Sequence, residues 1–589
     1  MLRYQVMPQN KQVKHRLSIL RNITLVALVI ITARLFFIQI FEHDAWVAKA
    51  NEQHTLLETI TAKRGEIYMM DHDEPVAVVL NQAAYQIVID PTVTKKEDAE
   101  KVMNTYAKDY QVANLDEVYN QEGLRYAIIA KNVPRETAEE IAKSEIPAIW
   151  LKKNNQRVYP EGEFASGLLG FVNNEGLGQY GVEGSLNEAL AGKDGLIKTT
   201  SDVNNVALSI GTDNIKIPAS DGANIVLSID RSLEKGIEEL TAEAIDKTAA
   251  TNASVLVMDP NTGKILTMAN LPNYDPNNYS NVNDAAAFNN YVTDIPYEPA
   301  SICKNFAFSA AINEGKMTPD TTYFNQHYEI VDEWKIWNAE QRSKLYGTLT
   351  MRDALYWSLN TGSIYALKLL GDDPSHINQQ GREKLFDYYY NKFRLGHVTG
   401  VELAEAEGFI PDPNEGWGRD STYANLTFGQ NLSITMLQTA TAFSAVVNGG
   451  TWRTPSVLAD VESNKEIIDN TEKVEDKILT DETSAMMREM LINNRSYKKR
   501  GGIDRAGYDV GGKSGTAQVV RDGAYDDSFS ELVGSYIGFV ATSGEMPKYI
   551  IMTKMWGEGK SISSSDAMDL FDTLSNYLID YMKIKPGAV

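Results

Sequence analysis

The chain has 589 residues, a formal net charge of −23 at pH 7 and a single cysteine, Cys303. This length allows two or three domains besides a membrane segment, whereas the negative charge disfavours a nucleic-acid partner, whose phosphates would be repelled. One cysteine excludes an internal disulfide and a cysteine-rich metal site, and the seven scattered histidines contain no helical metal-binding pair.

The N-terminal region has the pattern of a membrane anchor. No acidic residue precedes Glu42, basic residues recur over residues 1–22, and an apolar run extends from Ile23 to Phe41. At about 1.5 Å per residue this run spans roughly 28 Å, enough to cross the core of a bilayer. The basic flank predicts a cytoplasmic N-terminus and an extracytoplasmic location for everything after Phe41. Because no small-residue cleavage site follows, we expect an uncleaved, single-pass anchor rather than a buried soluble helix.

Residues 44–215 show no constellation of catalytic residues. The pattern over residues 84–89 is typical of a strand, and residues 97–106 and 135–144 are typical of polar helices. The stretch from Gly211 to Gly222 indicates a linker. We therefore expect a spacer or interaction domain in this region.

The C-terminal part alternates strands and helices. An apolar strand over residues 224–230 precedes an amphipathic helix over 232–247. Two apolar runs, 254–259 and 264–269, flank a glycine-containing turn and predict a hairpin. Strands at both ends with helices between them predict an α+β domain whose sheet is completed by distant segments. The late elements are two strands and a helix, over residues 535–539, 548–552 and 564–582.

The segment Gly507–Thr516 supports two incompatible interpretations. It satisfies the phosphate-binding pattern G-x-x-x-x-G-K-[ST], and it also contains Lys-Ser-Gly-Thr from Lys513, a variant of the Lys-Thr-Gly strand of penicillin-recognising acyl transferases. A phosphate-binding loop needs a buried strand before it and a helix after it. Polar and basic residues precede this segment and a short strand follows it, so the sequence favours the acyl-transferase interpretation.

Two upstream motifs agree with that interpretation. Ser301 and Lys304 have S-x-x-K spacing, which places a hydroxyl and an amine on one face of a helix, where a neutral lysine could take the serine proton. Pro299 is well placed to start this helix and leaves Ser301 near its positive end. Ser358 and Asn360 have S-x-N spacing, for which a helix end with a capping asparagine is the alternative. Each motif is weak alone, but the three occur in the order that is typical of penicillin-recognising enzymes.

With these motifs behind a membrane anchor, the chain resembles a class B penicillin-binding protein, the monofunctional transpeptidase that cross-links peptidoglycan. The resemblance covers nearly the whole chain and implies a pedestal or dimerisation-type domain over residues 44–215 and a transpeptidase domain over 216–589. Further segments similar to those of the family are residues 34–40, 63–68, 157–160, 170–184, 257–263, 274–277, 428–430 and 448–450.

The resemblance implies a role for each motif residue. Ser301 is expected to attack the carbonyl between the two terminal D-alanines of a stem peptide, with Lys304 as the general base. Ser358 and Lys513 would relay a proton to the leaving amine, and Asn360 would orient Lys304 and the substrate amide. No metal and no organic cofactor is implied.

Substrate binding is expected along the strand that begins at Lys513. Ser514, Gly515 and Thr516 would bind the substrate as an added edge strand and hold its terminal carboxylate. The backbone N–H groups of Ser301 and Thr516 would form the oxyanion hole.

Three positions depart from the family's usual residues. Glycine is usual where Ala300 and Asn431 stand, and an aromatic residue is usual where Cys303 stands. These departures could alter antibiotic affinity or the loop over the site, but they leave every reacting side chain intact.

The implied function is a peptidoglycan D,D-transpeptidase of the cell membrane, inhibited covalently by β-lactams, with septal synthesis during cell division favoured over elongation. A single-pass protein without a glycan-polymerising domain implies a polytopic membrane glycosyltransferase as partner, together with division proteins. The alternatives are an elongation transpeptidase, a β-lactam-hydrolysing or β-lactam-sensing relative, and a non-catalytic scaffold of the division machinery. The acceptor amine of the stem peptide stays open.

Overall fold

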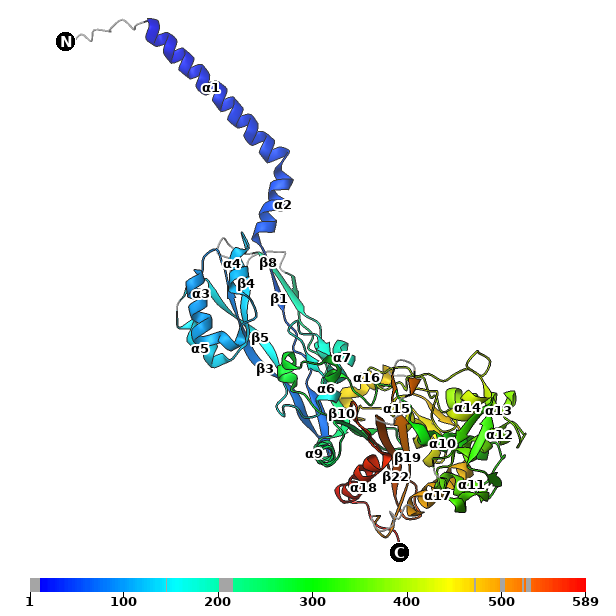
Figure 1. Cartoon of the computed structure of the whole chain (residues 1–589). Coiled ribbons are helices and arrows are strands. Elements are labelled where there is room, and N and C mark those ends of the chain that lie inside the picture. Colours follow the sequence, from blue (N-terminus) through cyan, green and yellow to red (C-terminus); the bar gives the residue numbers. More distant parts are fainter. Residues whose placement is uncertain are drawn as a thin grey trace, which may run out of the picture. The chain divides into compact units, whose positions relative to one another are not determined.

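A computed structural model describes residues 11–144, 146–200, 215–339, 341–470, 473–497, 504–521, 524–525 and 531–588 (Figure 1). The chain divides into two compact units. The first comprises the residues up to Ala62 together with Gly192–Asp221, and the second comprises Lys63–Ala191 and Gly222–Val589.

The first unit contains the predicted apolar helix. Helix α1 (Lys11–Ile40) has a mean hydropathy of 2.3 in its most apolar stretch, and none of that stretch is buried against the rest of the described chain. It is long and apolar enough to cross a membrane, so it is compatible with a single-pass anchor. The unit also holds α2 (His43–His54) and the antiparallel sheet of β1 (Thr55–Ile60), β8 (Gly195–Thr200) and β9 (Ile215–Ile217). The expected linker at 211–222 lies partly outside the described residues, and its described part includes β9.

The second unit begins with the non-catalytic sheet. Its strands are β2 (Ile67–Asp71), β3 (Glu74–Ile89), β4 (Ala127–Val133), β5 (Ile149–Val158) and β10 (Ile225–Asp230). The strand predicted at 84–89 is the end of the longer β3. The two predicted polar helices are α3 (Lys96–Val102), which continues into a π-helical turn, and α5 (Arg135–Ala142). Strand β10, expected at the start of the catalytic domain, pairs in parallel with β2 of this sheet. The division at residues 215 and 216 stays a prediction.

Three segments that resemble the family's pedestal motifs meet at Glu183, whose carboxylate is fully buried. Arg64 donates from Nε to one carboxylate oxygen at 2.7 Å, and Arg157 donates from Nε to the other at 2.6 Å. Arg64 also donates to Asn187 Oδ1 at 2.8 Å, and Arg157 donates to the Gly65 carbonyl at 2.7 Å. A buried carboxylate requires such pairing, and this cluster ties together segments more than a hundred residues apart.

The C-terminal part of the second unit is built on a five-stranded antiparallel sheet in the order β12-β11-β23-β22-β19. The predicted hairpin is β11 (Asn252–Met258) with β12 (Ile265–Leu271), and the late strands are β19 (Tyr508–Gln518), β22 (Leu532–Thr542) and β23 (Tyr549–Trp556). The α+β prediction, with a sheet completed by distant segments, is confirmed.

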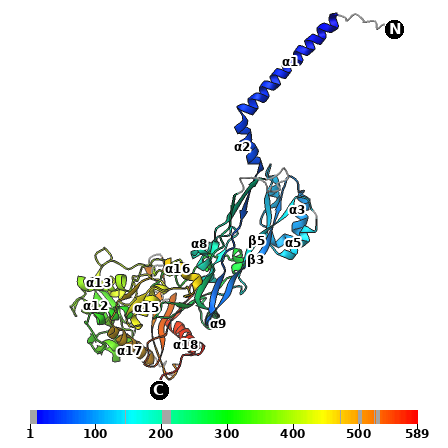
Figure 2. The same ribbon diagram turned by 180° about the vertical axis from the view of Figure 1, so that it is seen from behind.

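Helices cover both faces of this sheet. On one side, α9 (Arg231–Lys247) and α18 (Ser564–Tyr581) share an apolar cluster with the strands. On the other side lie α10 (Lys304–Asn313), α15 (Met436–Val447) and α17 (Asp481–Tyr497). Figure 1 shows α18 and α17 on opposite sides of β19 and β22, and Figure 2 shows the same arrangement from behind.

Shorter elements complete the second unit. They are α4 (Leu115–Asn120), α6 (Ser166–Leu169), α7 (Gly181–Ser185), α8 (Asn187–Ala191), α11 (Met351–Tyr356), α12 (Asn360–Leu370), α13 (Gln379–Phe386), α14 (Asp420–Leu426), α16 (Lys465–Asn470), β6 (Phe171–Val172), β7 (Gly178–Gln179), β13 (Thr322–Asn325), β14 (Tyr328–Val331), β15 (Trp334–Trp337), β16 (Gly347–Thr350), β17 (Thr451–Arg453), β18 (Glu475–Lys477), β20 (Val520–Arg521) and β21 (Ala524–Tyr525).

Candidate active site

Ser301 lies in a short 3-10 turn, Ala300–Cys303, that runs directly into α10. Pro299 precedes the turn, so Ser301 occupies the first turn of the helical segment, as predicted. Residues 304–312 of α10 are all buried, which fixes the helix in the core. As a result, Lys304 Nζ donates to Ser301 Oγ at 3.1 Å.

Lys304 is fully buried and is held by the S-x-N turn between α11 and α12. Its amine donates to the Ser358 carbonyl at 2.6 Å, to Ser358 Oγ at 3.2 Å and to Asn360 Oδ1 at 2.8 Å. Ser358 has a φ of +54°, a left-handed conformation in which its carbonyl and its hydroxyl both face Lys304.

Asn360 is the first residue of α12, but its side chain does not cap that helix. Its amide nitrogen instead donates to the Trp337 carbonyl on β15 at 2.8 Å, while its oxygen accepts from Lys304. The capping alternative is therefore wrong. Sequence reasoning missed Trp337, and because a backbone carbonyl carries no residue signature, no sequence signal pointed to it.

Lys513 reaches the same hydroxyl from the opposite side. It lies on β19 with its side chain fully buried, and its amine donates to Ser358 Oγ at 2.9 Å and to the Ser514 carbonyl at 3.0 Å. Ser358 Oγ therefore lies between the amines of Lys304 and Lys513. Proton transfer along Ser301, Lys304, Ser358 and Lys513 needs only motions within hydrogen-bond distance.

The phosphate-loop interpretation is not supported by the local structure. Residues 508–518 form one continuous strand, so Gly512, Lys513 and Ser514 lie within β19 and not in a loop before a helix. Gly507 has a φ of +85°, and a Cβ there would lie 2.7 Å from Pro586. This glycine is explained by packing against the C-terminal segment.

The predicted substrate strand lies at an edge of the sheet. Strand β19 pairs with β22 on one side and is the terminal strand of the order, so its other side can accept an added strand. Ser514 is buried and Thr516 is exposed. A Cβ at Gly515 would lie 2.4 Å from the Pro299 carbonyl, so glycine is what lets the strand approach the Ser301 turn. The oxyanion hole at the N–H groups of Ser301 and Thr516 stays a prediction.

The two positions at which the family's glycine is replaced both have left-handed backbones. The φ of Ala300 is +49° and that of Asn431 is +64°, a region that favours glycine. The Ala300 N–H donates to the Gly429 carbonyl at 3.2 Å, and the Asn431 N–H donates to Glu298 at 2.8 Å. Burial raises the pKa of the Cys303 thiol, which keeps it protonated and unreactive.

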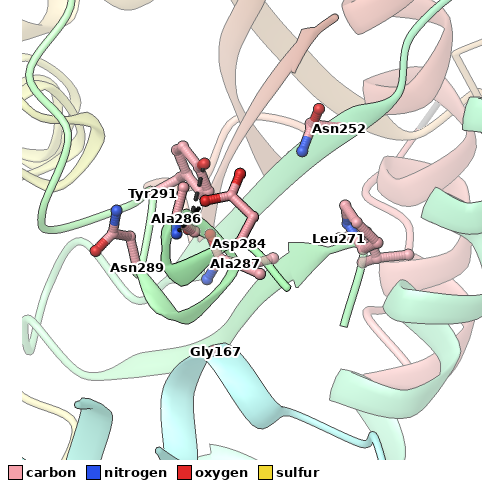
Figure 3. Close-up of a pocket in the computed structure, with 10 residues that line it drawn as sticks. Gly167, Asn252, Leu271, Asp284, Ala286, Ala287, Asn289 and Tyr291 are labelled. Atoms are coloured by element: carbon pink, nitrogen blue, oxygen red, sulfur yellow. Dashed lines mark hydrogen bonds between the residues drawn. The ribbon is translucent and has the colours of Figure 1, made fainter. Parts of the chain in front are cut away.

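Two hollows lie near these elements. A cleft of about 710 Å³ adjoins the end of β19 and is lined by Glu298, Asn431 and Ala517 among others. A smaller pocket of about 170 Å³ shares Tyr291 with it (Figure 3). In that pocket Tyr291 donates to the Ala286 carbonyl at 3.4 Å, and Asp284 accepts from the Ala286 N–H. None of the predicted site residues lines the smaller pocket.

A serine hydroxyl beside a buried lysine amine, with a second serine between that amine and a second lysine, is the arrangement of a serine acyl-transfer site with lysine as its base. The comparisons with known proteins agree with this class. A family model described as the penicillin binding protein transpeptidase domain matches residues 253–574, and one described as the penicillin-binding protein dimerisation domain matches residues 59–227. The chain belongs to the penicillin-binding protein family.

Similar proteins span most of the chain. Stage V sporulation protein D of Bacillus subtilis is 27% identical over 543 residues, 90% of this chain and 80% of that protein. The probable peptidoglycan D,D-transpeptidase PenA of Neisseria meningitidis serogroup A is 26% identical over 569 residues, 93% of this chain and 90% of that protein. Among solved structures, penicillin binding protein 2X from Streptococcus thermophilus has a TM-score of 0.67 at 23% identity and covers 90% of this chain and 80% of that one. This last likeness shows the fold.

Proposed function

We propose that this protein is a serine D,D-transpeptidase that cross-links peptidoglycan stem peptides. The observation that carries the proposal is the 3.1 Å hydrogen bond from buried Lys304 to Ser301 Oγ, linked through Ser358 to Lys513. The names of the relatives support the substrate class, since PenA is a probable peptidoglycan D,D-transpeptidase.

The first half-reaction forms an acyl-enzyme. Ser301 Oγ attacks the carbonyl carbon of the bond between the terminal D-alanines, and its proton moves to the neutral amine of Lys304. The C–N bond breaks, and the departing D-alanine nitrogen takes up a proton relayed through Ser358. Lys513 and the edge of β19 would hold the terminal carboxylate of the substrate.

The second half-reaction restores the enzyme. An amine on a neighbouring stem peptide attacks the ester carbonyl and gives up a proton to the lysine and serine relay. The bond between the acyl carbon and Ser301 Oγ then breaks, the cross-linked peptide leaves as an amide, and the serine oxygen regains its proton. A β-lactam carries out only the first half-reaction, because its leaving amine stays attached to the acyl group.

The test is covalent labelling of the full-length chain in detergent. Penicillin should add one penicilloyl mass on Ser301, and Ser301→Ala should add none. Ser309→Ala is the matched control, because Ser309 lies on α10, just after the Ser301 turn, and its hydroxyl donates to the Asn305 carbonyl. Labelling that persists in Ser301→Ala contradicts the proposal. Fast nitrocefin hydrolysis would favour a β-lactamase, and the absence of any acylation would favour a non-catalytic scaffold.

We further propose a septal role, with residues 1–22 in the cytoplasm, α1 across the membrane and the catalytic domain outside the cell. The apolar helix and the basic N-terminal flank support the orientation, and the family resemblance of the sequence supports the septal role. A polytopic membrane glycosyltransferase and division proteins are the proposed partners. A fluorescently tagged copy should concentrate at division sites, whereas a signal along the side wall would favour an elongation role.

A further inference from the structure

The cleft beside β19 is floored by one face of the catalytic sheet. Gly515 on β19 lies opposite Ser535 on β22, which lies opposite Lys554 on β23, so the three residues form a row across the sheet. Neighbours in such a row point to the same face, and a Cβ at Gly515 would meet the Pro299 carbonyl beside Ser301. Lys554 therefore points to the face on which the Ser301 turn lies. The next residues on this face, also lining the cleft, are Ala517, Val533 and Trp556.

Lys554 is a cation on a face that is otherwise uncharged along this row. It is 3% exposed, and its amine lies 4.3 Å from the centre of the Tyr297 ring and 4.7 Å from that of Trp556. Among the residues that the structure describes, no carboxylate forms an ion pair with it. Burial lowers the pKa of Lys554 to about 7, so its charge depends on what occupies the cleft.

The other ionisable groups of the cleft lie in its walls. They are Tyr291 and Tyr297 on the segment before Ser301, Glu298 beside them, and Glu531 just before β22. Glu298 accepts the backbone N–H of Asn431, and burial raises the pKa of Tyr297 and of Tyr291. Lys554 is thus the only cation that lines the described part of the cleft.

The position of the cleft relative to β19 indicates which ligand it takes. It begins at Ala517, one residue beyond the Lys513–Thr516 segment that is proposed to bind the terminal carboxylate of the substrate. An acyl group on Ser301 that extends away from that segment would pass over Ala517 and Val533. The charged side chain that it would meet on this face is Lys554, about 10 Å from Gly515 across two strand spacings.

We propose that the cleft holds the part of the donor peptide on the N-terminal side of the scissile bond, and that Lys554 binds a side-chain carboxylate of that part. This inference rests on the proposed transpeptidase function and makes Lys554 a residue that determines peptide specificity. A peptide whose side chain at that position ends in an amide leaves the amine of Lys554 among its aromatic neighbours, and such a peptide gains no charge-assisted hydrogen bond.

The experiment measures D-alanine release from pairs of synthetic peptides ending in D-alanyl-D-alanine, with the full-length protein in detergent. The peptides of a pair differ only in glutamate or glutamine at one of the three residues preceding the terminal pair. At pH 6.5 the wild type should prefer the glutamate peptide at one position by about tenfold in kcat/KM, the size of a hydrogen bond to a charged group. At pH 8.5 the preference should shrink, because Lys554 in the protein without bound peptide has then lost its positive charge.

The variants distinguish a specific role of Lys554 in peptide binding from a loss of folding. Lys554→Met should reduce the preference to within twofold, and Lys554→Arg should keep most of it. Lys548→Met, at an exposed lysine just before β23, is the matched control and should keep the full preference. Penicillin labelling of Ser301 reports whether each variant is folded. The pH series on the wild type tests the inference even if a variant does not fold.

Two results would overturn the inference while leaving the proposed function in place. One is D-alanine release that does not distinguish glutamate from glutamine at any of the positions. The other is a preference that survives in Lys554→Met. Absence of both D-alanine release and Ser301 labelling would overturn the proposed function and this inference with it.

Discussion

Replacing Asn360 by aspartate tests whether Lys304 is the general base. The substitution exchanges an amide for a carboxylate of the same shape at the atom that accepts from Lys304 Nζ at 2.8 Å. Lys304 is fully buried, so the new charge acts through protein rather than bulk water. A carboxylate in this position stabilises the ammonium form of Lys304, which cannot take the proton of Ser301.

The size of the effect follows from the geometry. Opposite unit charges about 4 Å apart interact by about 4 kcal/mol at an effective dielectric constant of about 20. The 2.8 Å contact should lengthen toward this distance, because a carboxylate oxygen cannot donate to the Trp337 carbonyl and is repelled by it. Since about 1.4 kcal/mol corresponds to a factor of ten, acylation at pH 7 should slow by about a thousandfold. The loss should shrink by up to about tenfold per pH unit once the pH exceeds the pKa of Lys304 in the wild type, because only the variant then still gains deprotonated Lys304.

The assay is the rate of penicilloyl formation on Ser301, followed by quenching and mass analysis between pH 6 and 10. Asn360→Ala is the control, because it removes the same acceptor without adding a charge and should show a loss that does not recover with pH. An Asn360→Asp variant that acylates within tenfold of the wild type at pH 7 would refute Lys304 as the base. A loss of equal size at every pH would instead assign the effect to the broken contact with Trp337.

Three further predictions concern stability. Glu183→Ala leaves two largely buried arginines without their carboxylate partner and should cost about 3–5 kcal/mol in unfolding free energy, measured by denaturant titration; a cost under about 1 kcal/mol would contradict the buried network. Ala300→Gly removes a Cβ from a left-handed backbone and should stabilise by up to about 1 kcal/mol, whereas Asn431→Gly should change little because asparagine tolerates this conformation; equal effects would argue against strain at Ala300. Burial raises the pKa of Glu238 from its usual 4.5 to about 7, so the folded state binds more protons and stability should fall by at most about 3 kcal/mol as pH rises through that window. Glu238→Gln should flatten this slope in a pH series of thermal unfolding, and an unchanged slope would exclude Glu238 as its source.

The elements that the sequence predicted correctly are those whose signals are local. The hairpin of β11 and β12 depends on two adjacent apolar runs and a turn, and the first turn of the Ser301 segment depends on Pro299. The pairing of β10 with β2 depends on contacts across more than 150 residues of chain, for which a single sequence carries no signal. The same holds for Glu183. The sequence shows the segments of Arg64 and Arg157 only as separate motifs, and the fold alone shows that Glu183 binds both arginines.

Lys554 shows how a candidate binding residue can be missed when a strand is predicted from its apolar residues alone. Strand β23 is apolar apart from a threonine and this one lysine, but the sequence predicts a strand only over residues 548–552, which leaves Lys554 outside it. A charged residue inside a buried strand is costly unless something compensates for it. That cost is a usable signal, and Trp556 lies only two residues away, but the ring of Tyr297 comes from a distant segment and carries no local sequence signal.

The segment Gly507–Thr516 shows why spacing alone could not choose between a nucleotide site and an acyl-transfer site. In a phosphate-binding loop, glycines allow backbone N–H groups to surround an anion. In β19, Gly515 serves a different need, because any side chain there would collide with the Pro299 carbonyl and push the strand away from Ser301. Lys513 can meet Ser358 only if β19 lies this close to the Ser301 turn, so the glycine controls the distance between the two halves of the site. The same residue types thus satisfy both patterns, and the strand geometry decides which chemistry they support.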